Sequence, residues 1–247
     1  MDIERVDPAP DRAFRRAVLR QRWEDLTFLH WAVEPELVAP LLPAGTRPDT
    51  LDGVAHVGLI GFRMVGLGLG QGPEVPYLGT FWETNVRLYS VDDTGRRAVV
   101  FRSLDASRLV PVLVARATLR LPYLWSAMRL DRDGDLLTYR CRRRWPGPAG
   151  ATSRMVVRVG EPLTDPTPLE HFVTARWALH TRAYGRTLHL PNWHPRWPLH
   201  RAELLHLDDE LVTAAGLPAP AGPPVSVLHS PGVPVAFGPP VALRQPG

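Results

Sequence analysis

The sequence of 247 residues contains no lysine, so all 29 of its basic residues are arginines. Enzymes that form an imine with a carbonyl substrate need the amine of a lysine side chain. Schiff-base catalysis is therefore excluded. The formal net charge is only +4, and we expect no nucleic-acid partner from an excess of this size.

Cysteine is also scarce, since Cys141 is the only one. One cysteine cannot form an internal disulfide or a Cys-x-x-Cys metal or redox motif, and it fits a reducing compartment. No apolar run approaches the roughly 18 residues that span a bilayer, and arginines interrupt the first twenty residues where a signal peptide would be apolar. We expect a cytoplasmic protein with no membrane partner.

Proline and glycine are abundant, with 27 and 20 residues, and they separate short apolar runs. This pattern favours antiparallel strands with few long helices. The strands are expected at residues 54–64, 81–91, 97–104, 125–132, 135–144 and 155–160. Helices are expected at residues 35–42, 109–119, 169–176 and 208–215.

One main domain is expected over residues 21–215, preceded by an arm at residues 1–20. The composition changes at residues 216–247, which hold nine prolines and five glycines. A proline-rich stretch of this kind is no packed helix. We expect extended chain that wraps the surface of the domain, with edge strands at residues 225–228 and 233–237.

One face of the expected strand at residues 81–91 is polar. Strand residues alternate between two faces, and the odd positions are Phe81, Glu83, Asn85, Arg87 and Tyr89. This strip either faces solvent or lines a cavity. In a cavity, the carboxylate, amide and guanidinium would converge on a small carbonyl or carboxylate compound, with Glu83 placed to move a proton.

Arg116 lies in the expected helix at residues 109–119, which is otherwise almost entirely apolar and should be buried. A buried arginine needs a carboxylate or the oxyanion of a ligand, since leaving it unpaired costs on the order of 3–5 kcal/mol. The expected partner is Asp105, Glu83 or a ligand.

Histidines gather late in the chain, at His180, His189, His194 and His200. The spacing of the last three does not match the i, i+4 pair of zinc hydrolases, and we expect them to pack with nearby tryptophans. The sequence therefore predicts no metal and no other cofactor.

A run of arginines at positions 140, 142, 143 and 144 splits between the two faces of an expected strand. A solvated or subunit-facing strand edge accounts for this run better than RNA binding does. Arginine-rich edges of this kind suggest a homo-oligomer.

Several segments resemble the YqjF-like family of uncharacterised bacterial proteins, among them Trp-Glu-Asp-Leu-Thr-Phe-Leu-His-Trp at residues 23–31. The others are residues 41–45, 61–64, 83–87, 101–106 and 121–123. More distantly, the chain is similar to the acetoacetate decarboxylase-like superfamily. The resemblance implies an α+β, mainly antiparallel fold, a cone-shaped β barrel with a few peripheral helices and a deep central pocket.

The same resemblance assigns roles to individual residues. In the decarboxylases a catalytic lysine follows a short motif, and a neighbouring lysine lowers its pKa; the resemblance implies Tyr123 and Leu124 at these two positions. It further implies Glu83 at the pocket glutamate and Arg116 at the arginine before the lysines.

Three functions remain open at this point. The pocket binds a small carbonyl or carboxylate metabolite without turnover, held by Arg116, Arg87 and Asn85. Alternatively it is a lysine-independent lyase or isomerase, in which Glu83 is the acid/base and Tyr123 donates to an enolate. In the third, side chains fill the barrel and the protein has a structural or assembly role. A perturbed pKa of Glu83 would favour the enzyme.

Overall fold

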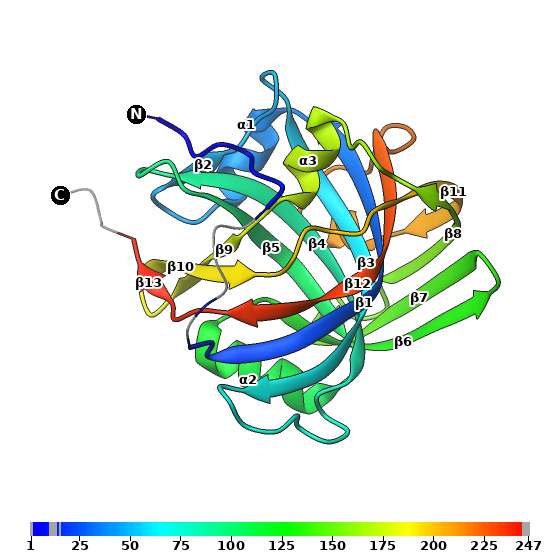
Figure 1. Cartoon of the computed structure of the whole chain (residues 1–247), viewed down its shortest axis with the longest axis horizontal. Coiled ribbons are helices and arrows are strands. Elements are labelled where there is room, and N and C mark those ends of the chain that lie inside the picture. Colours follow the sequence, from blue (N-terminus) through cyan, green and yellow to red (C-terminus); the bar gives the residue numbers. More distant parts are fainter. Residues whose placement is uncertain (1, 10–13, 15, 244–247) are drawn as a thin grey trace.

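The structure is a computed structural model, and it describes residues 2–9, 14 and 16–243. Residues 1, 10–13 and 15 of the expected arm and residues 244–247 of the expected C-terminal segment lie outside the described residues. Most of the described chain is strand (Figure 1). The strands are β1 (Leu19–Val33), β2 (Thr46–Pro48), β3 (Ala55–Leu69), β4 (Phe81–Asp92), β5 (Arg97–Ala106), β6 (Tyr123–Asp133), β7 (Leu136–Trp145), β8 (Thr152–Pro162), β9 (Ala178–Ala183), β10 (Arg186–Trp193), β11 (His200–Asp209), β12 (Ser226–Phe237) and β13 (Val241–Ala242).

Helices are few and short. They are α1 (Pro35–Val38), the 3-10 turn η1 (Ala39–Leu41), α2 (Leu109–Leu119), α3 (Pro168–Thr174) and α4 (Leu211–Ala214). Within the described residues, none of them combines the length and the apolar character needed to cross a bilayer. The prediction of a mainly antiparallel, strand-rich chain with few helices is therefore confirmed, whereas the cone shape stays a prediction.

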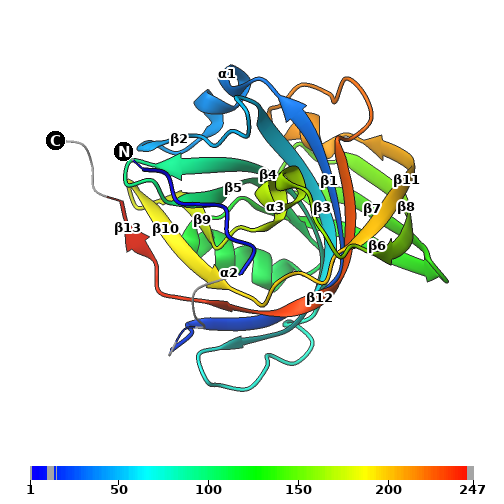
Figure 2. The same cartoon turned by 45° about the horizontal axis from the view of Figure 1, so that its top comes forward.

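The strands pair into two closed rings (Figures 1 and 2). The first ring runs through β4, β5, β9, β10, β12, β1 and β3. The second ring leaves β5 through β6, β7, β8 and β11 and returns to β12. The rings therefore share a wall made of β12, β1, β3, β4 and β5, called the shared wall below. Most pairs are antiparallel, but β5 pairs in parallel with β6 and β9.

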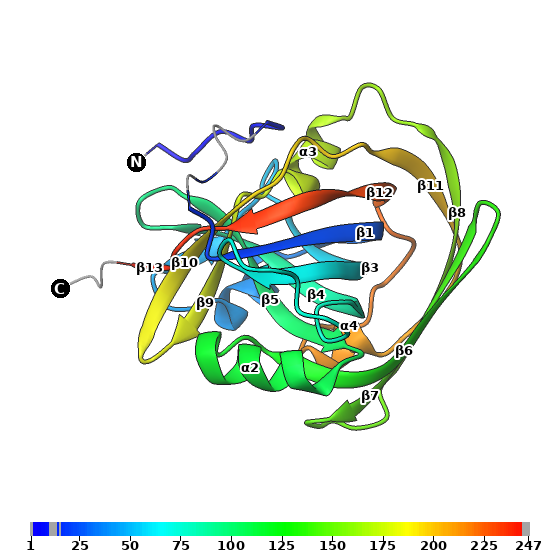
Figure 3. The ribbon, with the colours of Figure 1, turned by 60° about the horizontal axis from the view of Figure 1, so that its bottom comes forward.

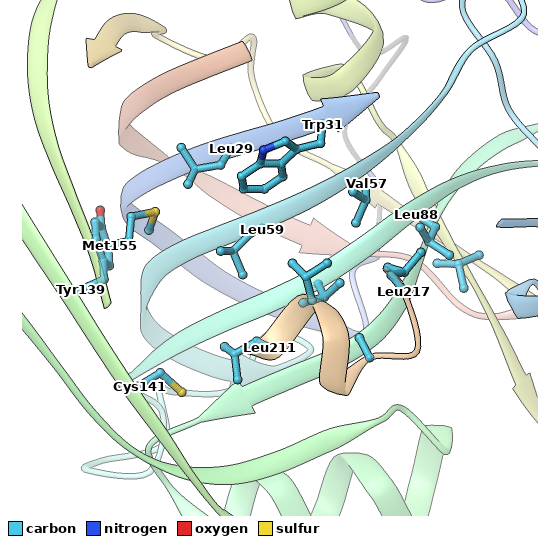
Figure 4. Packing of buried hydrophobic residues seen from close by; sticks show 14 of the residues in the cluster. Leu29, Trp31, Val57, Leu59, Leu88, Tyr139, Cys141, Met155, Leu211 and Leu217 are labelled. Atoms are coloured by element: carbon cyan, nitrogen blue, oxygen red, sulfur yellow. The ribbon is translucent and has the colours of Figure 1, made fainter. Parts of the chain in front are cut away.

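Alternation along the shared wall separates its side chains into two apolar layers. Val86 and Leu88 of β4 pack with Leu59 of β3 in a cluster that includes residues of β7 and β8, inside the second ring. Figure 4 shows Leu211 of α4 among the residues of this cluster. The opposite face of the wall, with Phe28 among its residues, turns toward the first ring.

Helix α2 is only partly buried, which corrects the expectation of a buried helix. Pro111, Ala115 and Leu119 recur every fourth residue and face the interior of the first ring. On the other side of the helix, Val110 and Val114 are 46% and 55% exposed. Figure 3 shows this outer side of α2 at the edge of the molecule. One apolar stripe is thus enough to hold the helix in place.

The proline-rich C-terminal segment contributes β12, which lies between β1 and β11 and also pairs with β10. The prediction of edge strands at residues 225–228 and 233–237 is therefore wrong. Leu228, Val233 and Val235 are buried in the apolar cluster that includes Phe28, which fits a strand paired on both sides. Gly232, with φ at +129°, lets the chain pass Trp23 closely, because a Cβ there would lie 2.1 Å from the Trp23 carbonyl oxygen.

Candidate functional site

A cavity of about 190 Å³ lies inside the first ring. An engineered apolar cavity of about 150 Å³ accommodates benzene, so this space has room for a small organic molecule. Its walls are mainly apolar, with Phe28, Phe101 and Leu104 among them. The polar residues that border it are Gln21, Glu83, Asn85, Arg87 and Tyr123. The interior of this ring is not filled by side chains.

The polar strip of β4 lines this cavity and does not face solvent, as the resemblance implied. Glu83 and Asn85 are 2% and 4% exposed. Their partners on β5 are Ala106 and Leu104, and a register shift after Val86 pairs Arg87 with Phe101. This bulge keeps Phe101 on the cavity side although it lies three residues from Leu104.

Glu83 and Tyr123, both placed in the pocket by the resemblance, lie next to each other in the structure. The Tyr123 hydroxyl donates a hydrogen bond of 2.9 Å to Oε2 of Glu83. Burial raises the pKa of Glu83 to about 8, although hydrogen bonds from Tyr123 and Asn85 oppose the rise. Burial, together with the negative charge of an ionised Glu83, raises the pKa of Tyr123 well above its ordinary value. Glu83 is therefore mostly a neutral acid at pH 7.

Two buried amide oxygens border the cavity without partners. Oδ1 of Asn85 and Oε1 of Gln21 accept no hydrogen bond from the described residues. Buried acceptors of this kind cost free energy unless a ligand or water satisfies them. Asn85 is a residue predicted from the sequence, but Gln21 is not. Gln21 lies in β1, a strand that the sequence did not lead us to expect, so no local signal marked it.

Arg87 also borders the cavity, and two oxygens fix its orientation. Nε donates to the Tyr89 hydroxyl over 3.0 Å, and Nη2 donates to the Val173 carbonyl over 2.9 Å. The Tyr89 hydroxyl in turn donates to the same carbonyl and lies 2.7 Å from Nε2 of His30. Among the described residues Arg87 has no carboxylate partner.

Arg116 is not among the residues that border the cavity, contrary to its predicted role in ligand binding. The expected ion pair with Asp105 or Glu83 is also wrong, because Nη1 of Arg116 donates to the Tyr123 carbonyl over 2.8 Å. Its guanidinium lies 5.7 Å from the centre of the Trp145 ring. Since α2 is partly exposed, Arg116 needs no buried carboxylate.

Asp105 instead pairs with Arg143, a member of the arginine run that was expected at a solvated or subunit-facing strand edge. Nε and Nη2 of Arg143 donate to the two carboxylate oxygens over 2.9 and 2.8 Å. The Ser126 hydroxyl adds a third bond of 2.7 Å. Arg143 is 2% exposed, whereas its neighbours Arg142 and Arg144 are exposed. Alternation of β7 thus buries one arginine of the run.

The late histidines do not form one group. His180 and His189 lie together, with Nε2 and Nδ1 3.2 Å apart, and Nε2 of His180 is 3.7 Å from Oδ2 of Asp92. These three residues offer atoms that a cation could take as ligands. However, Asp92 already accepts bonds from Arg96 and from the β4–β5 turn, so a metal would have to displace Arg96. His194 packs between Trp177 and Trp197, as expected.

The chain is similar to a family of proteins and to one protein of known sequence. Residues 20–234 match the model of DUF2071, a family described as an uncharacterized conserved protein. The uncharacterized protein YqjF of Bacillus subtilis strain 168 is 29% identical over 209 residues, which cover 84% of this chain and 86% of that protein.

Solved structures share the fold at low sequence identity. The enduracididine biosynthesis enzyme MppR complexed with pyruvate has a TM-score of 0.63 at 14% identity, covering 95% of this chain and 93% of that chain. An acetoacetate decarboxylase-like enzyme from Sphingomonas wittichii RW1 gives 0.60 at 14% identity, covering 92% and 93%. Acetoacetate decarboxylase from Legionella pneumophila gives 0.58 at 14% identity, covering 96% and 92%. The likeness is one of fold, a mostly-strand sheet with few helices.

Proposed function

Because the chain belongs to the DUF2071 family and has an acetoacetate decarboxylase-like fold, we propose that the cavity of its first ring binds a small carbonyl or carboxylate metabolite. The observation that supports this most directly is the pair of Glu83 and Tyr123, hydrogen-bonded to each other at the wall of an apolar cavity. The enzyme MppR, which has a similar fold, is known in complex with pyruvate, a carbonyl compound. The absence of lysine means that the carbonyl group is held without an imine.

Glu83 recognises the carbonyl oxygen as a neutral acid. With a pKa of about 8, most Glu83 side chains carry a proton at pH 7. Tyr123 donates to Oε2, so the acid proton is carried by Oε1 and is available to an acceptor in the cavity. The unpartnered Asn85 and Gln21 oxygens can accept a hydroxyl or a water that accompanies the ligand.

Binding of 2-octanone, measured by calorimetry at pH 7, tests this proposal. We expect Glu83→Leu to weaken binding by about tenfold, because the ketone loses its hydrogen-bond donor. Glu36→Leu is the control, since Glu36 is exposed on α1. No binding of 2-octanone or of shorter 2-alkanones to the wild-type protein, or equal affinities in Glu83→Leu, would contradict the proposal.

A second candidate function is non-covalent proton transfer, which the pKa of Glu83 favours because it lies near working pH. The ionised form of Glu83 removes a proton from the carbon next to the carbonyl group. The Tyr123 hydroxyl, released from Oε2, donates to the enolate oxygen. The proton on Glu83 then returns to carbon, at the same position in an exchange reaction or at a neighbouring one in an isomerisation.

Deuterium exchange into 2-octanone in heavy water, followed by proton NMR, tests the second function. Catalysed exchange should disappear in Glu83→Gln, which can hydrogen-bond but cannot accept the proton. Glu36→Gln should exchange like the wild-type protein. Binding without catalysed exchange would leave only the first function. The cavity itself argues against the third alternative, a structural protein with a filled interior.

A further inference from the structure

A second, smaller cavity of about 30 Å³ adjoins the first and is called the side chamber here. Its polar lining consists of Arg87, Thr174, Arg176, Asn192 and His194, together with the indole groups of Trp23 and Trp197. Six residues border both cavities, namely Trp23, Arg87, Phe101, Leu179, Trp197 and Phe237. A water molecule needs roughly 10–15 Å³ measured in this way, so the side chamber has room for the few atoms of a carboxylate group.

Three polar groups that border the side chamber are buried and lack partners. They are Nε1 of Trp23, Nη2 of Arg176 and the Oδ1 position of Asn192, none of which bonds to a described residue. The first two are donors only. The third is an acceptor, and the amide of Asn192 offers a donor to the side chamber only with its oxygen and nitrogen exchanged. The two unused donors, on Trp23 and Arg176, border one small space and call for an acceptor.

The charged side chains around the side chamber also favour an anionic ligand. Arg176 is 4% exposed; its Nη1 pairs with Asp49, which Arg97 also contacts. Arg87 is held by uncharged oxygens of Tyr89 and Val173. In the described part of the chain, no aspartate or glutamate borders the side chamber. The two guanidinium groups on its wall are therefore not neutralised from inside it, and a bound anion would balance them.

We propose that the side chamber binds an anionic group through Arg87, Arg176, Trp23 and Asn192. Where the main cavity holds a carbonyl compound, this group is the carboxylate of the same molecule, a step that rests on the proposed function. Glu83 and Arg87 lie four residues apart on β4, about 13 Å along a strand, and Arg87 bonds to Tyr89, away from Glu83. The ligand is therefore an oxo acid with an apolar spacer between the carbonyl group and the carboxylate.

Bromide tests the side chamber independently of any carbonyl ligand. Crystals of the wild-type protein soaked in sodium bromide should show an anomalous peak between Arg87 and Arg176, and crystals of Arg87→Met should lose it. The absence of a peak in the wild-type crystals, with the soak confirmed by bromide at other surface positions, would count against the anion site.

A matched pair of ligands tests the assignment of the carboxylate. 7-Oxooctanoate and 2-octanone differ only in a carboxylate that replaces a terminal methyl group. We expect the acid to bind about tenfold more tightly or better, because charge-assisted hydrogen bonds contribute more than neutral ones. Arg87→Met and Trp23→Phe should reduce this advantage, whereas Arg142→Met and Trp145→Phe, at exposed positions, should keep it.

The outcomes separate the two proposals. If 2-octanone binds through Glu83 but 7-oxooctanoate has no advantage, the carboxylate assignment is wrong and the proposed function stands. If bromide occupies the side chamber but neither ketone nor oxo acid binds, the anion site stands and the proposed function is wrong. Because Arg176 also pairs with Asp49, the variants avoid it and the fold is not put at risk.

Discussion

Glu83 and Tyr123 reach each other across the strand that separates them. Glu83 on β4 is paired with Ala106 of β5, and Tyr123 on β6 is paired with Leu104 of β5. Ala106 is fully buried, and as the β5 partner of Glu83 it adds only a methyl group beside the contact between the Tyr123 hydroxyl and the carboxyl group. The contact thus depends on a small residue on the intervening strand as well as on the two partners.

The raised pKa of Glu83 predicts a pH-dependent stability. In the unfolded chain this group ionises near its ordinary value of 4.5, whereas in the folded chain it keeps its proton up to about pH 8. The unfolded state therefore binds fewer protons between these values, and stability falls as pH rises, by about 1.4 kcal/mol per pH unit. Glu83→Gln removes this slope, and we expect it to be more stable than the wild-type protein at pH 8.

Urea unfolding from pH 5 to pH 9 measures this difference. The glutamine keeps an oxygen that accepts from Tyr123, so the hydrogen bond survives the change. Glu36→Gln, at an exposed position, should show the wild-type slope. Parallel stability curves for the wild-type protein and Glu83→Gln would show that Glu83 ionises normally in the folded state.

The substitution Tyr123→Phe should raise the pKa of Glu83 further. The hydrogen bond from Tyr123 lowers the pKa of Glu83 against the larger effect of burial, so its loss raises the pKa further above the ordinary range. Neutral Glu83 binds the ketone in the proposed function, and binding of 2-octanone should weaken above about pH 8 in the wild-type protein. In Tyr123→Phe the midpoint of this weakening should lie at higher pH. A midpoint at lower pH would mean that Tyr123 does not stabilise the carboxylate.

The buried pair of Arg143 and Asp105 predicts a large effect on stability. Both side chains are at most 2% exposed, and removing one partner leaves the other charged and unpaired. Arg143→Leu should therefore lower the free energy of unfolding by about 3–5 kcal/mol, measured by urea denaturation. Adding Asp105→Leu should recover part of this loss, because the unpaired carboxylate is then gone. Arg142→Leu, one residue away and exposed, should change stability by about 0.5 kcal/mol or less.

Much of the site could be read from alternation along one strand. Glu83, Asn85 and Arg87 share a face of β4 because strand residues alternate, and all three border the cavity. The bulge that keeps Phe101 on the same side follows from pairing, which the sequence does not show. Strand β1 was not expected, because the alternation of polar and apolar residues breaks at Asp25. This residue has φ at +49° and lies where the pairing of β1 with β3 shifts register, between Glu24 and Thr27.

The side chamber was beyond prediction for a different reason. Arg176 follows α3, Asn192 lies in β10 and Trp23 lies in β1, so only the closure of the first ring brings them together. Nothing in their local patterns distinguishes them from other arginines, asparagines and tryptophans. Contacts of this kind depend on pairings such as that of β10 with β12, which are long-range and carry no local signal.

Arg116 provides the sharpest contrast between the sequence and the structure. The resemblance to the acetoacetate decarboxylase-like superfamily implies a place for it in the ligand site, whereas in the structure it donates to the Tyr123 carbonyl outside the cavity. We expect Arg116→Met to lower the free energy of unfolding by about 1 kcal/mol, the usual contribution of one hydrogen bond. Its affinity for 7-oxooctanoate should stay within about twofold of the wild-type value, whereas Arg87→Met should lose about tenfold. A loss in Arg116→Met as large as that in Arg87→Met, measured by calorimetry on both folded variants, would return Arg116 to the ligand site. Since both changes remove one guanidinium from a partly buried side chain, the comparison separates contact with the ligand from the general effect of lost charge.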